Sequence, residues 1–160
     1  MSKFYLVGTG LFNSKDITLR GLEALKNSEV YLEDYTSLLQ CSKEDLESEW
    51  GVNITSLNRE EVEQKFEKEI LPKAKEKNIV LLVIGDPFGA TTHSALLLEA
   101  KNLGVDVEVI HNASIINAVG EVGLNLYKYG QVVSLPYPVD GVLPISSFEK
   151  IMENSRMGLH

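Results

Sequence analysis

The residues best suited to chemistry follow a strongly apolar stretch in the middle of the chain. Residues 79–84 are all valine, isoleucine or leucine, and residues 85–93 read Gly-Asp-Pro-Phe-Gly-Ala-Thr-Thr-His. The apolar run is typical of a strand that is buried on both faces of a parallel sheet. Ligands of such sheets bind in the crevice beyond the carboxyl ends of the strands. Segment 85–93 is therefore the first place to expect a binding site.

Asp86 is the best-placed polar group of this segment. Its carboxylate could accept hydrogen bonds from ribose hydroxyls or from a ligand amino group, or it could simply cap the following turn. Gly89 lacks a side chain and allows the backbone to approach a ligand closely. Thr91, Thr92 and His93 add two hydroxyls and an imidazole at the same edge. For His93 we favour the alternative that it caps or solvates the start of a helix.

A second polar loop, residues 111–115, follows the alternating strand pattern of residues 105–110. A helix that begins here would offer backbone N–H groups and the Ser114 hydroxyl to a ligand. The alternative is an ordinary polar loop with a serine at the N-cap of the helix. Because both loops follow successive predicted strands, we expect them to line one crevice.

The turn Gly8-Thr9-Gly10 follows the first predicted strand, where a nucleotide-binding turn would lie. However, Asn13 breaks the G-x-G-x-x-G pattern, and no P-loop lysine follows. A plain tight turn between strand and helix explains these glycines equally well.

Composition narrows the functional classes. The chain has 160 residues, is 44% hydrophobic and carries a net charge of −8, which argues against non-specific nucleic-acid binding. One cysteine and three histidines make a zinc cluster improbable, so we expect no metal. No run is long and apolar enough for a membrane span or a signal peptide, so we expect a cytoplasmic protein. Motifs of serine hydrolases and zinc proteases are absent.

Strand and helix patterns alternate along the chain. We predict strands at residues 4–7, 30–32, 79–84, 105–110 and 132–135. The predicted helices are, in order, 16–25 with Asp16 as cap, 42–50 with a capping box, 60–77 with a break at Pro72, 93–102 with Gly104 as stop, one capped by Ser114 or Asn112 that reaches about Val122, and one that starts at Ser146 or Ser147. This alternation predicts an α/β fold, a mainly parallel sheet with helices on both faces. We expect a domain over residues 1–135, and a connector and final helix over 136–160.

Several segments together resemble a known family. They are residues 16–25, 30–33, 35–39, 85–93, 109–115, 117–120 and 123–127. They are similar to the diphthine synthases, which are methyltransferases of the larger tetrapyrrole-methylase-like group. The sequence of segment 85–93 is most similar to the eukaryotic branch. The resemblance runs from the first strand to the end of the chain.

The resemblance implies an enzyme that uses S-adenosylmethionine and releases S-adenosylhomocysteine. Its substrate would be a histidine of translation elongation factor 2 that already carries a 3-amino-3-carboxypropyl group. The residues implied to contact the cofactor are Leu11, Asp86, Gly89, Ser114 and Ile115. The family also implies a homodimer for the full-length enzyme. The catalytic residues are unknown, because neither the motifs nor the spacing identifies a general base.

The sequence departs from the family pattern in two places. Residues 137–144 stand where the family has an aromatic-rich stretch with a Trp-Arg-Pro core. Family members also continue beyond the residues that match 158–160 into a second α/β domain. We therefore expect an N-terminal domain that lacks the second, and weak or no cofactor binding by this chain alone.

Two alternatives stay open at this point. One is a methyltransferase for a small molecule such as a tetrapyrrole. The other is a non-catalytic module that keeps the fold and binds elongation factor 2. Asp86, Gly89 and Ser114 argue against a purely structural role, although each has a structural explanation as well.

Overall fold

The computed structural model describes all residues except 1, 36, 90–92, 136–137 and 139–144. The predicted contributions of Thr91 and Thr92, and most of the departing stretch 137–144, lie outside the described residues. The chain forms two compact units, Met1–Ile116 and Asn117–His160.

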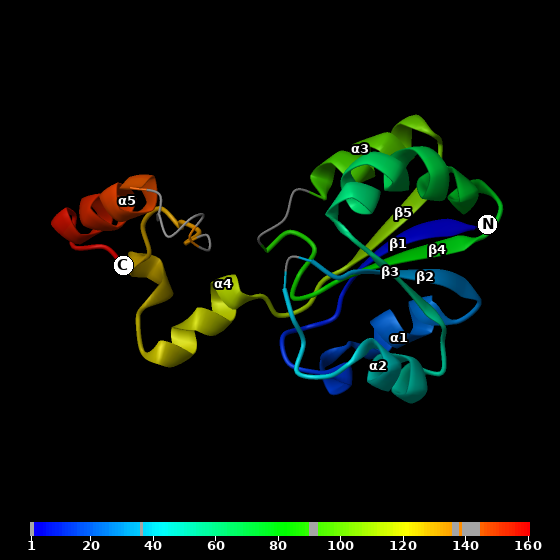
Figure 1. Cartoon of the computed structure of the whole chain (residues 1–160), viewed down its shortest axis with the longest axis horizontal. Helices are drawn as coiled ribbons and strands as arrows, with labels where there is room; N and C mark the ends of the chain where they lie inside the picture. Colours follow the sequence, from blue (N-terminus) through cyan, green and yellow to red (C-terminus); the bar gives the residue numbers. More distant parts are fainter. Residues whose placement is uncertain (1, 36, 90–92, 136–137, 139–144) are drawn as a thin grey trace. The chain divides into compact units, whose positions relative to one another are not determined.

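The first unit is built on a parallel sheet of five strands (Figure 1). The strands are β1 (Lys3–Gly8), β2 (Ser28–Glu33), β3 (Ile54–Leu57), β4 (Asn78–Val83) and β5 (Asp106–Ile110). Their order in the sheet is β3-β2-β4-β1-β5, and every neighbouring pair is parallel. The predicted α/β class with a parallel sheet is confirmed.

Helices cover both faces of this sheet (Figure 1). On one face lie α1 (Leu19–Leu25) and α2 (Lys43–Trp50). On the other lie η2 (Glu61–Ile70), η3 (Leu71–Lys75) and α3 (Ser94–Asn102). A sheet covered in this way needs strands that are apolar on both sides.

The central strand β4 meets that need residue by residue. Ile79 and Leu81 pack into the core beneath η2 and α3, whereas Val80 and Leu82 pack into the core beneath α1 and α2. All four side chains are fully buried. Because successive side chains of a strand point to opposite faces, an unbroken apolar run serves both cores.

The start of α1 differs from the prediction. Thr18 is the N-cap, and its hydroxyl accepts a hydrogen bond from the Gly21 N–H at 3.0 Å. Asp16 ends a short 3-10 turn, η1 (Ser14–Asp16), and its carboxylate binds the N–H groups of Leu11 and Phe12 instead. The prediction of Asp16 as the cap was therefore wrong, because its side chain turns back to the preceding loop.

Other local predictions are confirmed. Ser42 and Asp45 form the capping box of α2. The helix of residues 60–77 changes between Ile70 and Leu71 from the π-helical η2 to the 3-10 helix η3, so that Pro72, which has no N–H, lies in the first turn of η3. Gly104 follows the end of α3 with a φ of +70°. The four-residue edge strand β3 was missed, because so short a run has little sequence pattern.

The second unit contains short helices and one longer helix. Their bounds are η4 (Val119–Val122), η5 (Leu126–Lys128) and α5 (Ile145–Arg156), while α4 (Ile115–Ala118) spans the boundary between the units. The predicted strand at 132–135 was wrong: these residues form no strand. The described part of this unit contains no strand that could pair with them, and the Ser134 carbonyl accepts a bond from the Ser147 hydroxyl instead.

Candidate functional site

Three loops meet at the carboxyl edge of the sheet. β1 lies between β4 and β5, so the segments that follow these strands, 9–16, 84–93 and 111–115, leave from neighbouring positions. The chain passes from β1 to α1 on one face and from β4 to α3 on the other. Loops that diverge in this way mark the position at which parallel sheets bind ligands.

Backbone hydrogen bonds join the first two loops. The Gly85 N–H donates to the Gly10 carbonyl at 2.7 Å, and the Gly10 N–H donates to the Gly85 carbonyl at 3.3 Å. Both glycines have a φ of +83°, which other residues adopt only with strain. A Cβ on Gly8 would lie 2.6 Å from the Gly85 carbonyl oxygen. The turn 8–10 therefore needs its glycines in order to pair with the neighbouring loop, which supports the tight-turn alternative.

Asp86 links the second loop to the third. Its Oδ1 accepts a hydrogen bond from the Phe88 N–H at 2.9 Å. Its Oδ2 accepts one from the Asn112 N–H at 3.0 Å and lies 2.9 Å from Nδ1 of His111. The side chain thus caps its own turn and also holds the loop after β5.

The charge state of Asp86 follows from these contacts. Burial raises the pKa of the carboxyl group, since its side chain is only 13% exposed. The hydrogen bonds from Phe88, Asn112 and His111 together outweigh this effect, so the pKa lies below that of an ordinary aspartate. Asp86 is therefore a carboxylate at neutral pH.

Asn112 ties the third loop to the first. Its side-chain amide donates to the carbonyl of Gly8 and to that of Asp16, both at 3.0 Å, while its Oδ1 accepts from the Ala113 N–H at 2.8 Å. From the sequence alone, Asn112 was considered only as a helix cap. No spacing pattern could have shown this role, because its partners lie about a hundred positions earlier in the chain.

Four of the five predicted cofactor residues lie close together. A Cβ placed on Gly85 would have Cδ2 of Leu11 and Cα of Ser114 at 3.8 Å, so the bare glycine separates these two residues. Gly89 contacts Ser114 so closely that a Cβ on it would lie 2.6 Å from the serine Cβ. Together with Asp86, which follows Gly85, these residues form one cluster, which we name the cradle. The fifth residue, Ile115, begins α4 and is 60% exposed.

His93 lies elsewhere. It occupies the N-cap position of α3, but its ring makes no capping bond. Its Nε2 lies 2.6 Å from Oε2 of Glu33, the last residue of β2, and the two side chains are 7% and 2% exposed. This buried pair anchors the end of segment 85–93 to a strand on the far side of β4. Glu33 was not among the predicted site residues, because its only signal in the sequence is a charge that ends an apolar strand.

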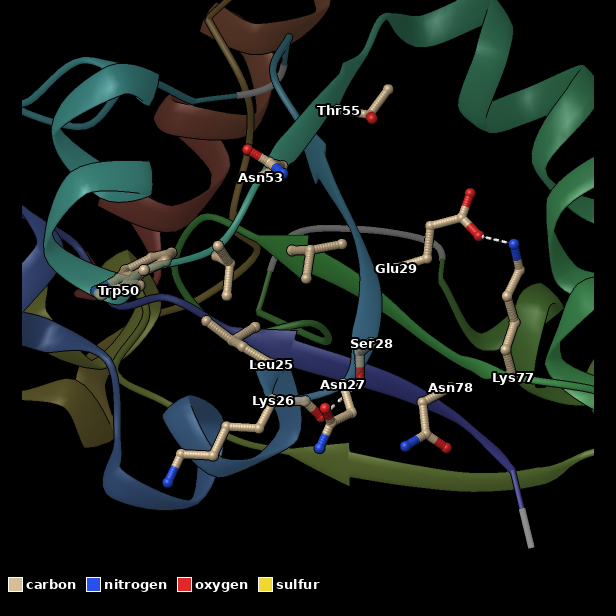
Figure 2. Close-up of a pocket in the computed structure, with 13 residues that line it drawn as sticks. Leu25, Lys26, Asn27, Ser28, Glu29, Trp50, Asn53, Thr55, Lys77 and Asn78 are labelled. Atoms are coloured by element: carbon tan, nitrogen blue, oxygen red, sulfur yellow. Dashed lines mark hydrogen bonds and ion pairs between the residues drawn. The ribbon is translucent and has the colours of Figure 1, made fainter.

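A separate hollow of about 840 Å³ lies at the opposite edge of the sheet (Figure 2). Ser28 and Asn78, with which β2 and β4 begin, line it together with Trp50 and an ion pair between Glu29 and Lys77. This is the amino edge of the strands, where none of the predicted site residues lies. We therefore place the candidate site at the carboxyl edge.

Among the described residues, no group of three or more histidine, cysteine, aspartate or glutamate side chains is arranged to hold a metal ion. In the same part of the chain, no helix combines the length and apolar character that crossing a membrane requires.

Comparison with known proteins identifies similar sequences. The sequence profile of the Tetrapyrrole (Corrin/Porphyrin) Methylases matches residues 3–158. The diphthine methyl ester synthase of Saccharomyces cerevisiae is 52% identical over 158 residues, and that of Homo sapiens is 50% identical over 157. Each alignment covers 98% of this chain, but 52% and 55% of the relatives. The chain thus spans about half the length of the curated relatives it matches.

The fold leads to the same group. The crystal structure of a diphthine synthase matches with a TM-score of 0.89 and 38% identity, over 99% of this chain and 62% of that chain. Profile, relatives and structure agree with the resemblance that the motifs indicated, which is thereby confirmed. The chain belongs to the tetrapyrrole methylase family.

Proposed function

We propose that this protein acts in the synthesis of diphthamide as a diphthine synthase. It would use S-adenosylmethionine to methylate the 3-amino-3-carboxypropyl-histidine of translation elongation factor 2. The observation that carries the proposal is the identity of about half the residues, over 98% of the chain, with proteins named diphthine methyl ester synthase.

The cradle at the carboxyl edge supports the use of this cofactor. Leu11 offers an apolar contact, while Gly85 and Gly89, which lack side chains, let Leu11 and Ser114 come close to the loop after β4. Ser114 and Ile115 supply the start of α4. S-adenosylmethionine would provide a methyl group on a positively charged sulfur, together with ribose hydroxyls and an amino group for the protein to bind.

Asp86 has a narrower role in this proposal than its position first indicated. A carboxylate has about four acceptor positions, and three of them on Asp86 are directed to Phe88, Asn112 and His111. Asp86 therefore acts mainly by holding two loops together, so that their backbone groups face the ligand. One acceptor position is left for a ribose hydroxyl or an amino group.

The proposed chemistry suits a site built from loops. Transfer of a methyl group from a sulfonium releases a neutral thioether, so the reaction needs an acceptor held in line with the breaking bond. Rigid loops joined by the Gly10–Gly85 bridge and by Asn112 provide that kind of positioning. We further propose that the full-length protein is a cytoplasmic homodimer. Its partner would be elongation factor 2, and it would bind neither nucleic acid nor a membrane.

Methyl transfer to elongation factor 2 tests the proposal. The protein is expressed from its complete reading frame and incubated with S-adenosylmethionine and elongation factor 2 that carries the 3-amino-3-carboxypropyl group. Mass spectrometry of the modified peptide should show added methyl groups. Elongation factor 2 with an unmodified histidine is the control and should gain none.

The same assay separates the alternatives. Transfer to a tetrapyrrole but not to the protein substrate would favour the small-molecule enzyme. Capture of elongation factor 2 without any transfer would favour the non-catalytic module. Calorimetry with S-adenosylhomocysteine adds a readout that does not depend on turnover, and absence of binding by the complete protein would contradict the proposed cofactor.

A further inference from the structure

His111 is held by one ring nitrogen and open at the other. Its Nδ1 lies 2.9 Å from Oδ2 of Asp86, and the ring of Phe88 lies beside it with the centroids 5.8 Å apart. The His111 side chain is 66% exposed, whereas that of Asp86 is 13% exposed. A fixed carboxylate therefore orients an imidazole whose far edge faces solvent next to the cradle.

The hydrogen-bond pattern determines which nitrogen is free. Asp86 accepts backbone N–H groups on both oxygens, from Phe88 and Asn112, and is therefore an ionised acceptor. A carboxylate can bond to Nδ1 only if that nitrogen carries a hydrogen. In the neutral ring, Nε2 is then an unprotonated base. No hydrogen bond to Nε2 is formed within the described part of the chain.

The proposed acceptor has two groups with different needs. Its amine is an ammonium ion at neutral pH and must lose a proton before nitrogen can attack. Its carboxylate is already an anion and needs no base. A general base at the site would therefore accelerate methylation of nitrogen and leave formation of the methyl ester unaffected.

We propose that Nε2 of His111 is this base and that Asp86 is its positioning residue; the inference rests on the proposed function. Nε2 takes a proton from the ammonium group, and the freed lone pair bonds to the methyl carbon of the sulfonium donor. The carbon–sulfur bond breaks, and its electrons stay on sulfur in a neutral thioether. The imidazolium then releases its proton to water, and each further N-methylation repeats the cycle.

His111→Asn tests the assignment, because asparagine can still donate to Asp86 but cannot take up a proton. With the complete protein, N-methylation of elongation factor 2 should slow by about a hundredfold or more. Ester formation, measured separately on a substrate whose amine is already trimethylated, should keep its wild-type rate. The matched control is His160→Asn, because His160 also packs against an aromatic ring, that of Tyr129, at 5.5 Å. It should change neither rate.

A measurement without substrates supports or overturns the geometry. Nitrogen NMR of the wild-type protein should show the neutral His111 ring with its hydrogen on Nδ1; hydrogen on Nε2 would overturn the proposal.

The kinetic outcomes separate this inference from the proposed function. Normal N-methylation by His111→Asn, or equal loss of N-methylation and ester formation, would overturn the role of His111 while the methyltransferase stands. Absence of transfer by the wild-type protein would refute the proposed function, and the base with it.

Discussion

The substitution Asp86→Asn tests whether one carboxylate holds the candidate site together. Asparagine keeps an oxygen that can accept the Phe88 N–H, as Oδ1 does now. Its amide nitrogen would replace Oδ2 and face another donor, the Asn112 N–H, so this hydrogen bond between neighbouring loops would be lost. The contact with Nδ1 of His111 would persist only in the other tautomer of the ring, in which Nδ1 accepts a hydrogen bond. The size of the side chain would not change.

The structure sets the size of the expected effect. A hydrogen bond to a charged acceptor contributes about 1.5–3 kcal/mol. The bond from Asn112 is partly buried and should contribute about 2 kcal/mol, whereas that from the exposed His111 should add less than about 1 kcal/mol. We expect Asp86→Asn to lower the free energy of unfolding by about 2–3 kcal/mol, measured by urea denaturation at pH 7.

Asp106→Asn is the matched control. Asp106 begins β5 at the opposite edge of the sheet, its side chain is 62% exposed, and its ion pair with Lys3 spans 3.6 Å. Such surface pairs contribute about 0–1 kcal/mol. If Asp86→Asn destabilised the protein no more than Asp106→Asn, the carboxylate would not be the link between the loops that its contacts indicate.

The pH dependence of this difference has a definite sign. The folded-state pKa of Asp86 lies below its unfolded value of about 3.9. Its stabilising effect is therefore complete above that value and is lost as the pH falls through the folded-state pKa. The gap between wild type and Asp86→Asn should narrow as the pH falls below about 4. A gap that widens in that acid range would refute the reasoning.

Three further substitutions have expected outcomes. Gly89→Ala should lower the free energy of unfolding in urea by about 1–3 kcal/mol, because the added Cβ would overlap Ser114 in the loop after β5. It should also weaken binding of S-adenosylhomocysteine in calorimetry. The control is Gly120→Ala, whose Cβ would have its nearest side-chain atom at 3.5 Å and which should leave binding unchanged. His93→Leu should lower the free energy of unfolding by about 3–5 kcal/mol in the same urea assay, since it removes the imidazole that lies 2.6 Å from the buried Glu33 carboxylate. A loss below about 1 kcal/mol would contradict a stabilising pair. Thr18→Ala should cost about 1 kcal/mol in thermal or urea unfolding through loss of the α1 cap, and an unchanged stability would argue against that cap.

The parallel sheet could be predicted because its central strands have a strong pattern. The run at residues 79–84 is apolar at every position, and the structure uses alternate side chains for the two cores. The segment 132–135 has a similar apolar composition but forms no strand. The difference lies in the partner: β4 pairs with β1 and β2, whereas the described part of the second unit has no strand to offer. Pairing is a long-range property that local composition does not contain.

The sequence predicted which loops form the candidate site but not the side-chain contacts that join them. Segments 85–93 and 111–115 were expected to converge, and Asp86 indeed bonds to the backbone of Asn112. The same expectation did not include the bridge from the Asn112 side chain to Gly8. It also assigned His93 a capping role, whereas the His93 ring lies against the carboxylate of Glu33, the last residue of β2.

The sequence by itself determined the two-sided apolar strands, the positions of the polar loops after them, and the family motifs. These are local features, set by side-chain type and by the period of two along a strand. Only the tertiary structure decided that Gly10 pairs with Gly85, that Asp86 orients His111, and that Glu33 meets His93. Each of these contacts joins loops from different strands, and the strand order that brings them together arises when both faces of the sheet are buried at once.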